Sequence, residues 1–265
     1  MVETKKISRV KKQPENFIKF LGTAGARFVM IKQMRASGGI WISYEGSNVL
    51  IDPGPGSLVR CASSKPKLDP GKLDAIILTH RHLDHSNDLN VMIEAMTEGG
   101  FKKRGMVFMP SDCLDSDPVI LRHVRTLPEK IVVLKEGGEY QAGNIKFATP
   151  KRQIHTVETY GLKFTFGKKE VSFITDTRYF EDIDKFYNSE IIIISTVFYE
   201  PHLGIDHLSL SDAQEIILKI QPKTAILTHF GMSMLRNKPH DICRRLTKEM
   251  GIEILAAYDG MGFLL

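Results

Sequence analysis

The amino-acid sequence predicts an α/β fold, in which short strands alternate with amphipathic helices. Short apolar or alternating runs recur along the chain and end at glycine, proline or a polar residue, as strands do. Some of the segments between them space apolar residues three or four apart, which is typical of helices. One strand pattern occurs twice, as Ala75-Ile76-Ile77-Leu78-Thr79-His80 and as Thr224-Ala225-Ile226-Leu227-Thr228-His229. This repeat suggests a duplicated half whose strand tips meet at a common site.

The length and composition favour one domain. A chain of 265 residues with 42% hydrophobic residues can bury a sizeable core. Its formal charge of +5 is concentrated at the start, where residues 1–20 carry six basic and two acidic side chains. We therefore expect a basic N-terminal segment at residues 1–16 and a single domain at 17–265. The segment could bind nucleic-acid phosphates or simply be solvated, and the sequence does not decide between the two.

The cysteines and the hydropathy bear on the compartment. The chain has three widely spaced cysteines and no apolar run of membrane-spanning or signal-peptide type. An odd number of cysteines without a Cys-x-x-Cys pair argues against a disulfide framework, and small packed residues are the expected role. These features predict a cytoplasmic protein with no membrane contact.

The expected elements follow one another along the chain. Strands are expected at 17–23, 39–44, 48–51, 75–78, 106–109, 131–134, 145–148, 162–166, 171–175, 191–194, 224–228, 252–257 and 262–264. The third ends at Asp52-Pro53-Gly54-Pro55-Gly56, where prolines and glycines enforce a turn. The isoleucine run 191–194 predicts a central strand buried on both faces. Helices are expected at 89–96, from a Ser209 or Ser211 cap to Ile220, and at 241–250.

The segment Thr79-His80-Arg81-His82-Leu83-Asp84-His85 is the densest group of metal-binding residue types in the chain. An extended backbone would present His80, His82 and Asp84 on one side. His85, where a helix should begin, cannot point in the same direction. Two adjacent metal positions are therefore predicted, one holding the first two imidazoles and the other holding Asp84 and His85.

This H-x-H-x-D-H segment after an apolar strand resembles the signature of the metallo-β-lactamase superfamily. The resemblance implies a four-layer αββα sandwich, the metallo-β-lactamase fold, with a dinuclear metal site between its two sheets. It also implies that His155 is the third histidine of the first metal and that Asp52 has a structural part. A carboxylate shared between two cations relieves their repulsion, and Asp176 is expected in that place. The complete expected ligand set is His80, His82, Asp84, His85, His155, Asp176 and His229.

Imidazole and carboxylate ligands without thiolate favour two zinc ions, with manganese or iron as alternatives. The superfamily's di-iron oxygen-reducing branch carries a glutamate at the position of His82, so His82 argues against that branch. A water bridging two such cations ionises near neutral pH and would be the attacking hydroxide. Asp84 and His207 are the expected catalytic residues.

His207 points to one branch of the superfamily, because it begins the pattern His-Leu-Ser-Leu-Ser-Asp-Ala ahead of His229. This pattern resembles the phosphodiesterase branch, which includes ribonuclease Z and small cyclic-phosphate phosphodiesterases, where such a histidine is thought to stabilise the phosphate and protonate the leaving oxygen. A core histidine bonded to the backbone is the simpler alternative.

The spacing of the ligands bears on the size of the substrate. Ribonuclease Z inserts a transfer-RNA-gripping arm between the positions that correspond to His155 and Asp176, and here that interval has room only for a hairpin. A small or cyclic phosphodiester is therefore favoured over RNA. Hydrolysis of a thioester, lactone or lactam is the alternative activity. Homodimers are common among relatives, and the sequence does not show whether this chain forms one.

Overall fold

Branched and aromatic side chains form the first of two sheets. The computed structural model describes residues 16–115 and 117–265, so most of the expected basic segment 1–16 lies outside the described residues. In these residues the first sheet has seven strands in the order β14-β1-β2-β3-β4-β5-β6. Their bounds are β14 (Gly262–Leu264), β1 (Phe17–Phe20), β2 (Ile40–Tyr44), β3 (Ser47–Ile51), β4 (Ala75–Ile77), β5 (Met106–Met109) and β6 (Lys130–Val133). Strands β3 to β6 are mutually parallel, and the other pairs are antiparallel.

The second sheet also has seven strands, in the order β13-β12-β11-β10-β9-β8-β7. Their bounds are β13 (Glu253–Ala256), β12 (Thr224–Thr228), β11 (Ile191–Ser195), β10 (Lys169–Ile174), β9 (Leu162–Phe166), β8 (Ile145–Thr149) and β7 (Gly138–Ala142). Strands β10 to β13 are parallel, whereas β7 to β10 form antiparallel pairs. The interval between His155 and Asp176 thus contains only the β9–β10 hairpin, as expected.

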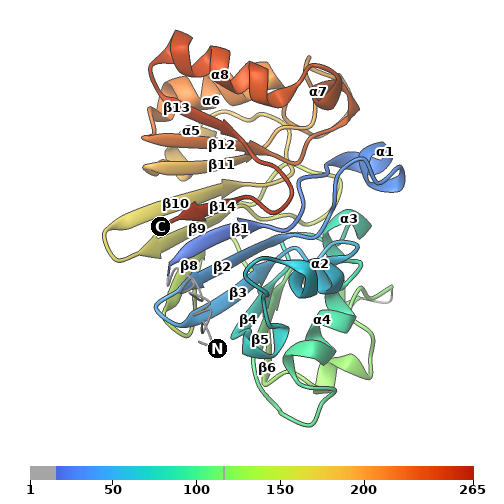
Figure 1. Cartoon of the computed structure of the whole chain (residues 1–265). Coiled ribbons are helices and arrows are strands. Elements are labelled where there is room, and N and C mark those ends of the chain that lie inside the picture. Colours follow the sequence, from blue (N-terminus) through green and yellow to red (C-terminus); the bar gives the residue numbers. More distant parts are fainter. Residues whose placement is uncertain (1–15, 116) are drawn as a thin grey trace, which may run out of the picture.

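Helices cover the outer face of each sheet, as Figure 1 shows. The longer helices on the first sheet are α2 (Ser57–Ser63) and α4 (Leu89–Met96), and those on the second are α6 (Leu210–Ile220) and α8 (Pro239–Met250). Shorter helices are α1 (Ala26–Ile31), α3 (Leu83–Ser86), α5 (Ile183–Phe186) and α7 (Met232–Arg236), with 3-10 turns at Pro70–Lys72, Ser111–Leu114 and Val124–Thr126. One apolar cluster lies between the sheets and one lies under each helical layer. The predicted αββα sandwich is confirmed.

Strand β11 shows how the sequence builds these layers. Ile191 and Ile193 pack between the sheets, and Ile192 and Ile194 pack against the outer helices. The strand is central and buried on both faces, as its continuous isoleucine run predicted. No helix of residues 16–115 and 117–265 has the length and apolarity needed to cross a membrane. The three cysteines are buried and free, as expected.

The carboxyl ends of the parallel strands position the polar residues. Asp52 follows β3, and the His80 loop follows β4, its parallel neighbour. Asp176 and His229 follow β10 and β12, which flank β11 in the second sheet. Parallel neighbours end at the same edge, so side chains distant in sequence meet there.

Several local expectations were wrong. The first strand ends at Phe20 rather than residue 23, and β4 ends at Ile77. The extended backbone expected through Asp84 is not formed, because Asp84 lies in the helix α3. No strand was expected between residues 134 and 145, where β7 begins at Gly138. Helices α1, α2, α5 and α7 were not predicted.

Candidate metal centre

A loop and one helical turn position the central motif. The backbone of Leu78 still bonds to β5 through the carbonyl of Phe108 at 2.8 Å. His80 and His82 then lie in an irregular loop, and α3 turns Asp84 and His85 toward the second sheet. The motif side chains therefore converge through a loop-to-helix turn, not through strand alternation.

The seven predicted ligands come together as two groups with one carboxylate between them. Ligand atoms of His80, His82 and His155 lie within 4.8 Å of one another, as do those of Asp84, His85 and His229. Within the first group, His155 Nε2 is 3.2 Å from His82 Nδ1. Within the second, Asp84 Oδ2 is 3.6 Å from both His85 Nε2 and His229 Nε2.

Asp176 lies between the two groups. Its Oδ2 atom is 3.9 Å from His80 Nε2, 3.4 Å from His85 Nε2 and 3.2 Å from His229 Nε2. The carboxylate is buried, and its Oδ1 atom has no hydrogen-bond partner. One carboxylate therefore faces imidazoles of both groups.

Hydrogen bonds behind the rings of His80, His85 and His155 hold Nδ1 of each ring and leave Nε2 pointing inward. Nδ1 of His85 is 2.9 Å from Asp52 Oδ2, and Nδ1 of His155 is 2.9 Å from the carbonyl oxygen of Asp206. Nδ1 of His80 lies 3.1 Å from the Thr79 hydroxyl. Each Nε2 is then free to face the centre, which is the tautomer arrangement that metal-binding histidines use.

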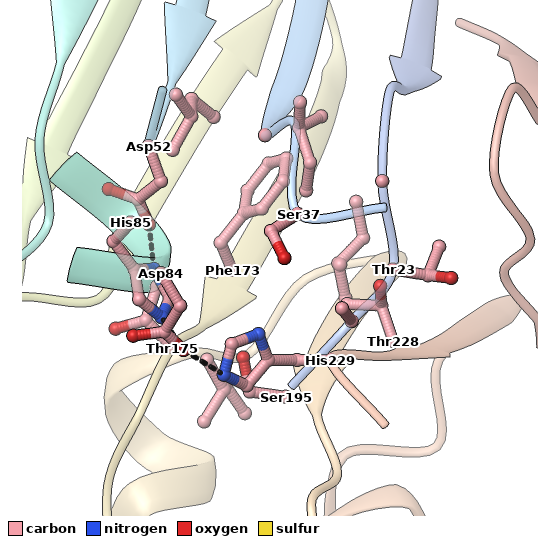
Figure 2. A pocket seen from close by; sticks show the side chains of 17 residues that line it. Thr23, Ser37, Asp52, Asp84, His85, Phe173, Thr175, Ser195, Thr228 and His229 are labelled. Atoms are coloured by element: carbon pink, nitrogen blue, oxygen red, sulfur yellow. Dashed lines mark hydrogen bonds and ion pairs between the residues drawn. The ribbon is translucent and has the colours of Figure 1, made fainter. Parts of the chain in front are cut away.

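Among the residues behind the candidate ligands, Asp52 bonds to two different residues of the motif. Its carboxylate accepts from the Thr79 backbone N–H and the Thr79 hydroxyl, both at 2.7 Å, besides its contact with His85. Figure 2 shows Asp52 behind the His85 ring and Asp84 directed toward His229. A single acid thus ties the motif loop to the following helix.

The buried nitrogen and oxygen atoms at the centre are spaced as metal ligands are, and several of them have no hydrogen-bond partner. Nε2 of His80, His85 and His229 is buried without a hydrogen-bond partner. Two ligand atoms that each lie about 2.0–2.1 Å from zinc in a tetrahedral site are about 3.3 Å apart. Most of the separations above are close to that value, and unpaired buried polar atoms are rare unless something satisfies them. The donor set therefore suits divalent cations.

Charge and burial set the protonation of these groups. Burial lowers the pKa of His80 well below its usual range and lowers that of His82 to about 4, so both rings are neutral. Burial alone would raise the pKa of Asp176, but the neighbouring His229 and His85 hold it well below its usual range. Burial opposes protonation of His85, yet the carboxylates around it raise its pKa. The centre thus offers the neutral imidazoles of His80 and His82 and the ionised carboxylate of Asp176 to a cation, and a cation bound beside His85 would take the place of the proton that the carboxylates favour there.

His207 lies beside this cluster. Its Nδ1 atom is 3.5 Å from Asp176 Oδ2 and forms a further potential ligand group with His155 and Asp176. Nδ1 is buried and has no hydrogen-bond partner, so a core histidine bonded to the backbone through this atom is not what the structure has. Burial lowers the pKa of the His207 imidazole.

Asp84 and His229 also line a small cavity of about 60 Å³ whose wall is more apolar than polar. Thr23, Ser37 and Ser195 line it as well, as Figure 2 shows. Its volume and these hydroxyl groups suit water.

Some supporting residues were not found from the sequence. The carbonyl of Asp206 holds His155, and the Thr177 hydroxyl accepts the N–H of Ile154, which precedes that histidine. A carbonyl leaves no signal in a sequence. Thr79 did leave one, since Thr-His ends both copies of the internal repeat. The side chain of Arg178, two residues after Asp176, is largely exposed, and its Nε lies 4.0 Å from Asp206 Oδ1.

The chain is similar in sequence to known metallo-hydrolases. Residues 47–230 match the family model described as the beta-lactamase superfamily domain. The probable metallo-hydrolase YhfI of Bacillus subtilis is 26% identical over 212 residues, covering 76% of this chain and 81% of YhfI.

Solved structures show the same fold. The crystal structure of YhfI superposes with a TM-score of 0.77 at 21% identity, covering 95% of this chain and 99% of YhfI. A diphosphatase from the PhnP family gives 0.72 at 20% identity, with 94% and 98% covered. The short form of human tRNase Z gives 0.69 at 17% identity, with 93% and 98% covered.

Proposed function

Because the chain belongs to the metallo-β-lactamase superfamily of hydrolases, we propose that its convergent side chains hold two divalent metal ions and that it hydrolyses phosphodiesters. His80, His82 and His155 would hold the first ion, and Asp84, His85 and His229 the second. Asp176 would bridge them. Zinc suits this donor set, with manganese or iron as alternatives. Bound in this way, the cations would supply Lewis acidity and an activated water near neutral pH.

The observation that carries the choice of substrate is the position of His207. Its unpaired, buried ring nitrogen faces Asp176 at the edge of the cluster. A phosphodiester carries a negative charge, and an anion beside an imidazole raises its pKa. Substrate binding would therefore favour the protonated ring, which can bond a non-bridging oxygen and give its proton to the leaving oxygen.

The surroundings of the centre favour a small substrate. Between His155 and Asp176 the chain forms only the β9–β10 hairpin, and between Asp176 and His207 it forms α5 and β11. Neither interval provides a projecting arm with which to hold a folded RNA. A small or cyclic phosphodiester is the proposed substrate, with RNA a weaker candidate.

Metal analysis and a substrate panel test this proposal together. Purified protein should hold close to two metal ions per chain and hydrolyse bis-(p-nitrophenyl) phosphate. The panel should also contain a phosphomonoester, a thioester, a lactone and a lactam. Turnover of the thioester or lactone without any phosphodiesterase activity would favour the alternative activity.

The variant His207→Ala separates catalysis from metal binding. Loss of a general acid typically costs about 10²–10⁴-fold in rate, so kcat on the diester should fall by that amount while two metals remain bound. His123→Ala, which alters an exposed histidine, is the matched control. Loss of a metal together with activity would instead identify His207 as a ligand, and unchanged turnover would remove the proposed catalytic role.

A further inference from the structure

A second pocket, of about 550 Å³, opens beside the metal centre. Its walls come from α1, from the segment after β11 and from the start of α7. Among its lining residues are Phe28, Phe198, Tyr199, His202, Met232 and Arg236. The Phe198 ring centroid is 6.1 Å from that of His207, and the N–H of Gly231 bonds the carbonyl of Val197 at 3.1 Å. The pocket therefore shares a wall with the proposed catalytic histidine.

The walls of this pocket are largely apolar and aromatic. Phe28 lies in the first turn of α1, and its side chain is 65% exposed. Phe198 stacks on His202 with ring centroids 5.3 Å apart and planes inclined by 30°. Ligand pockets of this size are typically apolar with a few polar groups that orient the ligand. The exposed Phe28 ring at the rim is therefore available for stacking, whereas the half-buried Phe198 ring already stacks on His202.

The pocket has polar groups on the segment after β11, at Tyr199, Glu200 and His202, and on another side at α7. Arg236 is exposed and forms no ion pair with a carboxylate in the described residues. Asn237 uses its side-chain N–H to bond the carbonyl of Ser233 at 2.9 Å, which leaves its amide oxygen as an acceptor. A ring with polar edges, or a plain ring beneath the guanidinium, would suit this side.

We propose that this pocket binds a planar aromatic group attached to the phosphate of the substrate. The inference rests on the proposed phosphodiesterase function, because the phosphate would lie at the metals. Since the pocket adjoins His207, the ester oxygen that carries the ring lies on the side of the proton donor. An aryl ester and a nucleoside ester share this chemistry, and binding measurements can distinguish them.

Diester analogues whose ring cannot be released test the pocket directly. In the methyl esters of benzylphosphonic, cyclohexylmethylphosphonic and ethylphosphonic acid (the phenyl, cyclohexyl and ethyl compounds), a P–C bond replaces the P–O bond to the leaving group and the anionic head group is the same. The corresponding adenosine compound, with a methylene group in place of O5′, adds a nucleobase. Titration calorimetry on the metal-loaded protein should show the phenyl compound binding more tightly than the cyclohexyl one, which has similar bulk but no planar ring. Tighter binding of the adenosine compound than of the phenyl compound would assign the pocket to a base.

Two variants identify the residues responsible. Aromatic stacking is worth about 1–3 kcal/mol per base, so Phe28→Ala or Phe198→Leu should weaken phenyl binding about fivefold or more and leave ethyl binding unchanged. Phe101→Ala, at a 93% exposed ring far along the chain from the pocket, is the matched control.

The outcomes separate the two proposals. Equal affinity for the phenyl and cyclohexyl compounds, or unchanged phenyl affinity in both variants, overturns the aromatic pocket and leaves phosphodiester hydrolysis standing. Failure of every phosphonate to bind, together with no hydrolysis of the diester, overturns the function on which the inference rests.

Discussion

At the scale of single residues, Asp52 shows how the centre is held. The residue follows β3 with a left-handed backbone angle, φ +49°, that turns its carboxylate toward the motif loop. Both carboxylate oxygens accept hydrogen bonds, from Thr79 and from His85. Residues behind metal ligands set the orientation and basicity of those ligands. Asp52 thus positions His85.

Asp52→Asn tests this positioning role. An amide has one acceptor oxygen, so in either orientation its NH₂ group would face a donor from Thr79 or His85. We expect metal affinity to fall about 10–100-fold, as for other supporting residues of metal sites. Titration against a competing chelator measures it, with Asp115→Asn on an exposed acid as control. Equal affinity in both variants would contradict the role of Asp52.

The sequence predicted which residues would be candidate ligands better than it predicted which groups hold those ligands in place. Four ligand candidates cluster in residues 80–85, and the repeated strand tip indicated His229. His155 was expected only from the resemblance to the superfamily, and Asp176 from the need for a carboxylate between two cations. The bond from His155 to the carbonyl of Asp206 could not be found, since every residue has a carbonyl. The expectation of an extended backbone through Asp84 was wrong because a segment this short is too brief to tell the alternating pattern of a strand from one turn of helix.

At the scale of elements, close backbone approaches define the centre. A Cβ atom at Gly25, directly before α1, would lie 2.0 Å from the carbonyl oxygen of His229. The N–H of Gly25 also bonds the carbonyl of Phe230 at 3.0 Å. The entry to α1 therefore packs against the backbone that carries His229, and only glycine permits this distance.

Gly25→Ala should displace His229. Overpacking of this kind costs about 1–3 kcal/mol of stability, and the bound metal should fall from two toward one per chain. Gly262→Ala is the control, because a Cβ there meets no atom within 4 Å and the residue has no left-handed φ. Urea denaturation and metal analysis measure the two effects, and two fully bound metals in Gly25→Ala would refute the displacement.

Helix α6 begins three residues after His207, with a capping box at its N-cap Ser209. The Ser209 hydroxyl accepts from the Asp212 N–H at 3.3 Å, and Asp212 Oδ2 accepts from the Ser209 N–H at 2.8 Å. Such caps satisfy backbone N–H groups that the helix itself leaves unpaired. The cap therefore fixes where the chain leaves the centre.

Ser209→Ala should lower the free energy of unfolding by about 1 kcal/mol, the usual cost of losing an N-cap side chain. Ser63→Ala, at the exposed end of α2, should change it much less. Chemical denaturation of the two variants under the same conditions measures the difference. Equal stabilities would show that the box adds nothing to the helix start.

Long elements were easier to predict than short ones. Helices α4, α6 and α8 have enough turns for a periodic apolar pattern, whereas α1, α3 and α7 have too few residues to show one. Strand β7 lies at a sheet edge with exposed polar residues, so it lacks the apolar signal of a buried strand. Tertiary contacts determine such elements more than local sequence does.

At the scale of the whole molecule, the candidate metal centre lies where the two sheets meet. His80, His82, Asp84 and His85 come from the first sheet's connections, and His155, Asp176 and His229 come from the second's. The repeated Thr-His strand ends predicted this convergence. The aromatic pocket was not predictable, because α1 and α7 approach each other from opposite ends of the chain.

If metals bind there, removing them should therefore weaken the contact between the two halves of the molecule, each formed by one sheet and its helices. A ligand at about 1,000 times its dissociation constant adds about 4 kcal/mol to stability, and 1 kcal/mol shifts the melting temperature by about 2–4 °C in a domain of this size class. Chelation should thus lower the melting temperature by roughly 10 °C. Calorimetry before and after metal removal measures the shift, with the zinc-saturated chelator as control. Restoring zinc should recover the original value, because the gain depends only on free metal concentration. An unchanged melting temperature after verified removal would mean that the apolar core and the hydrogen bonds between the two halves join them without help from metal.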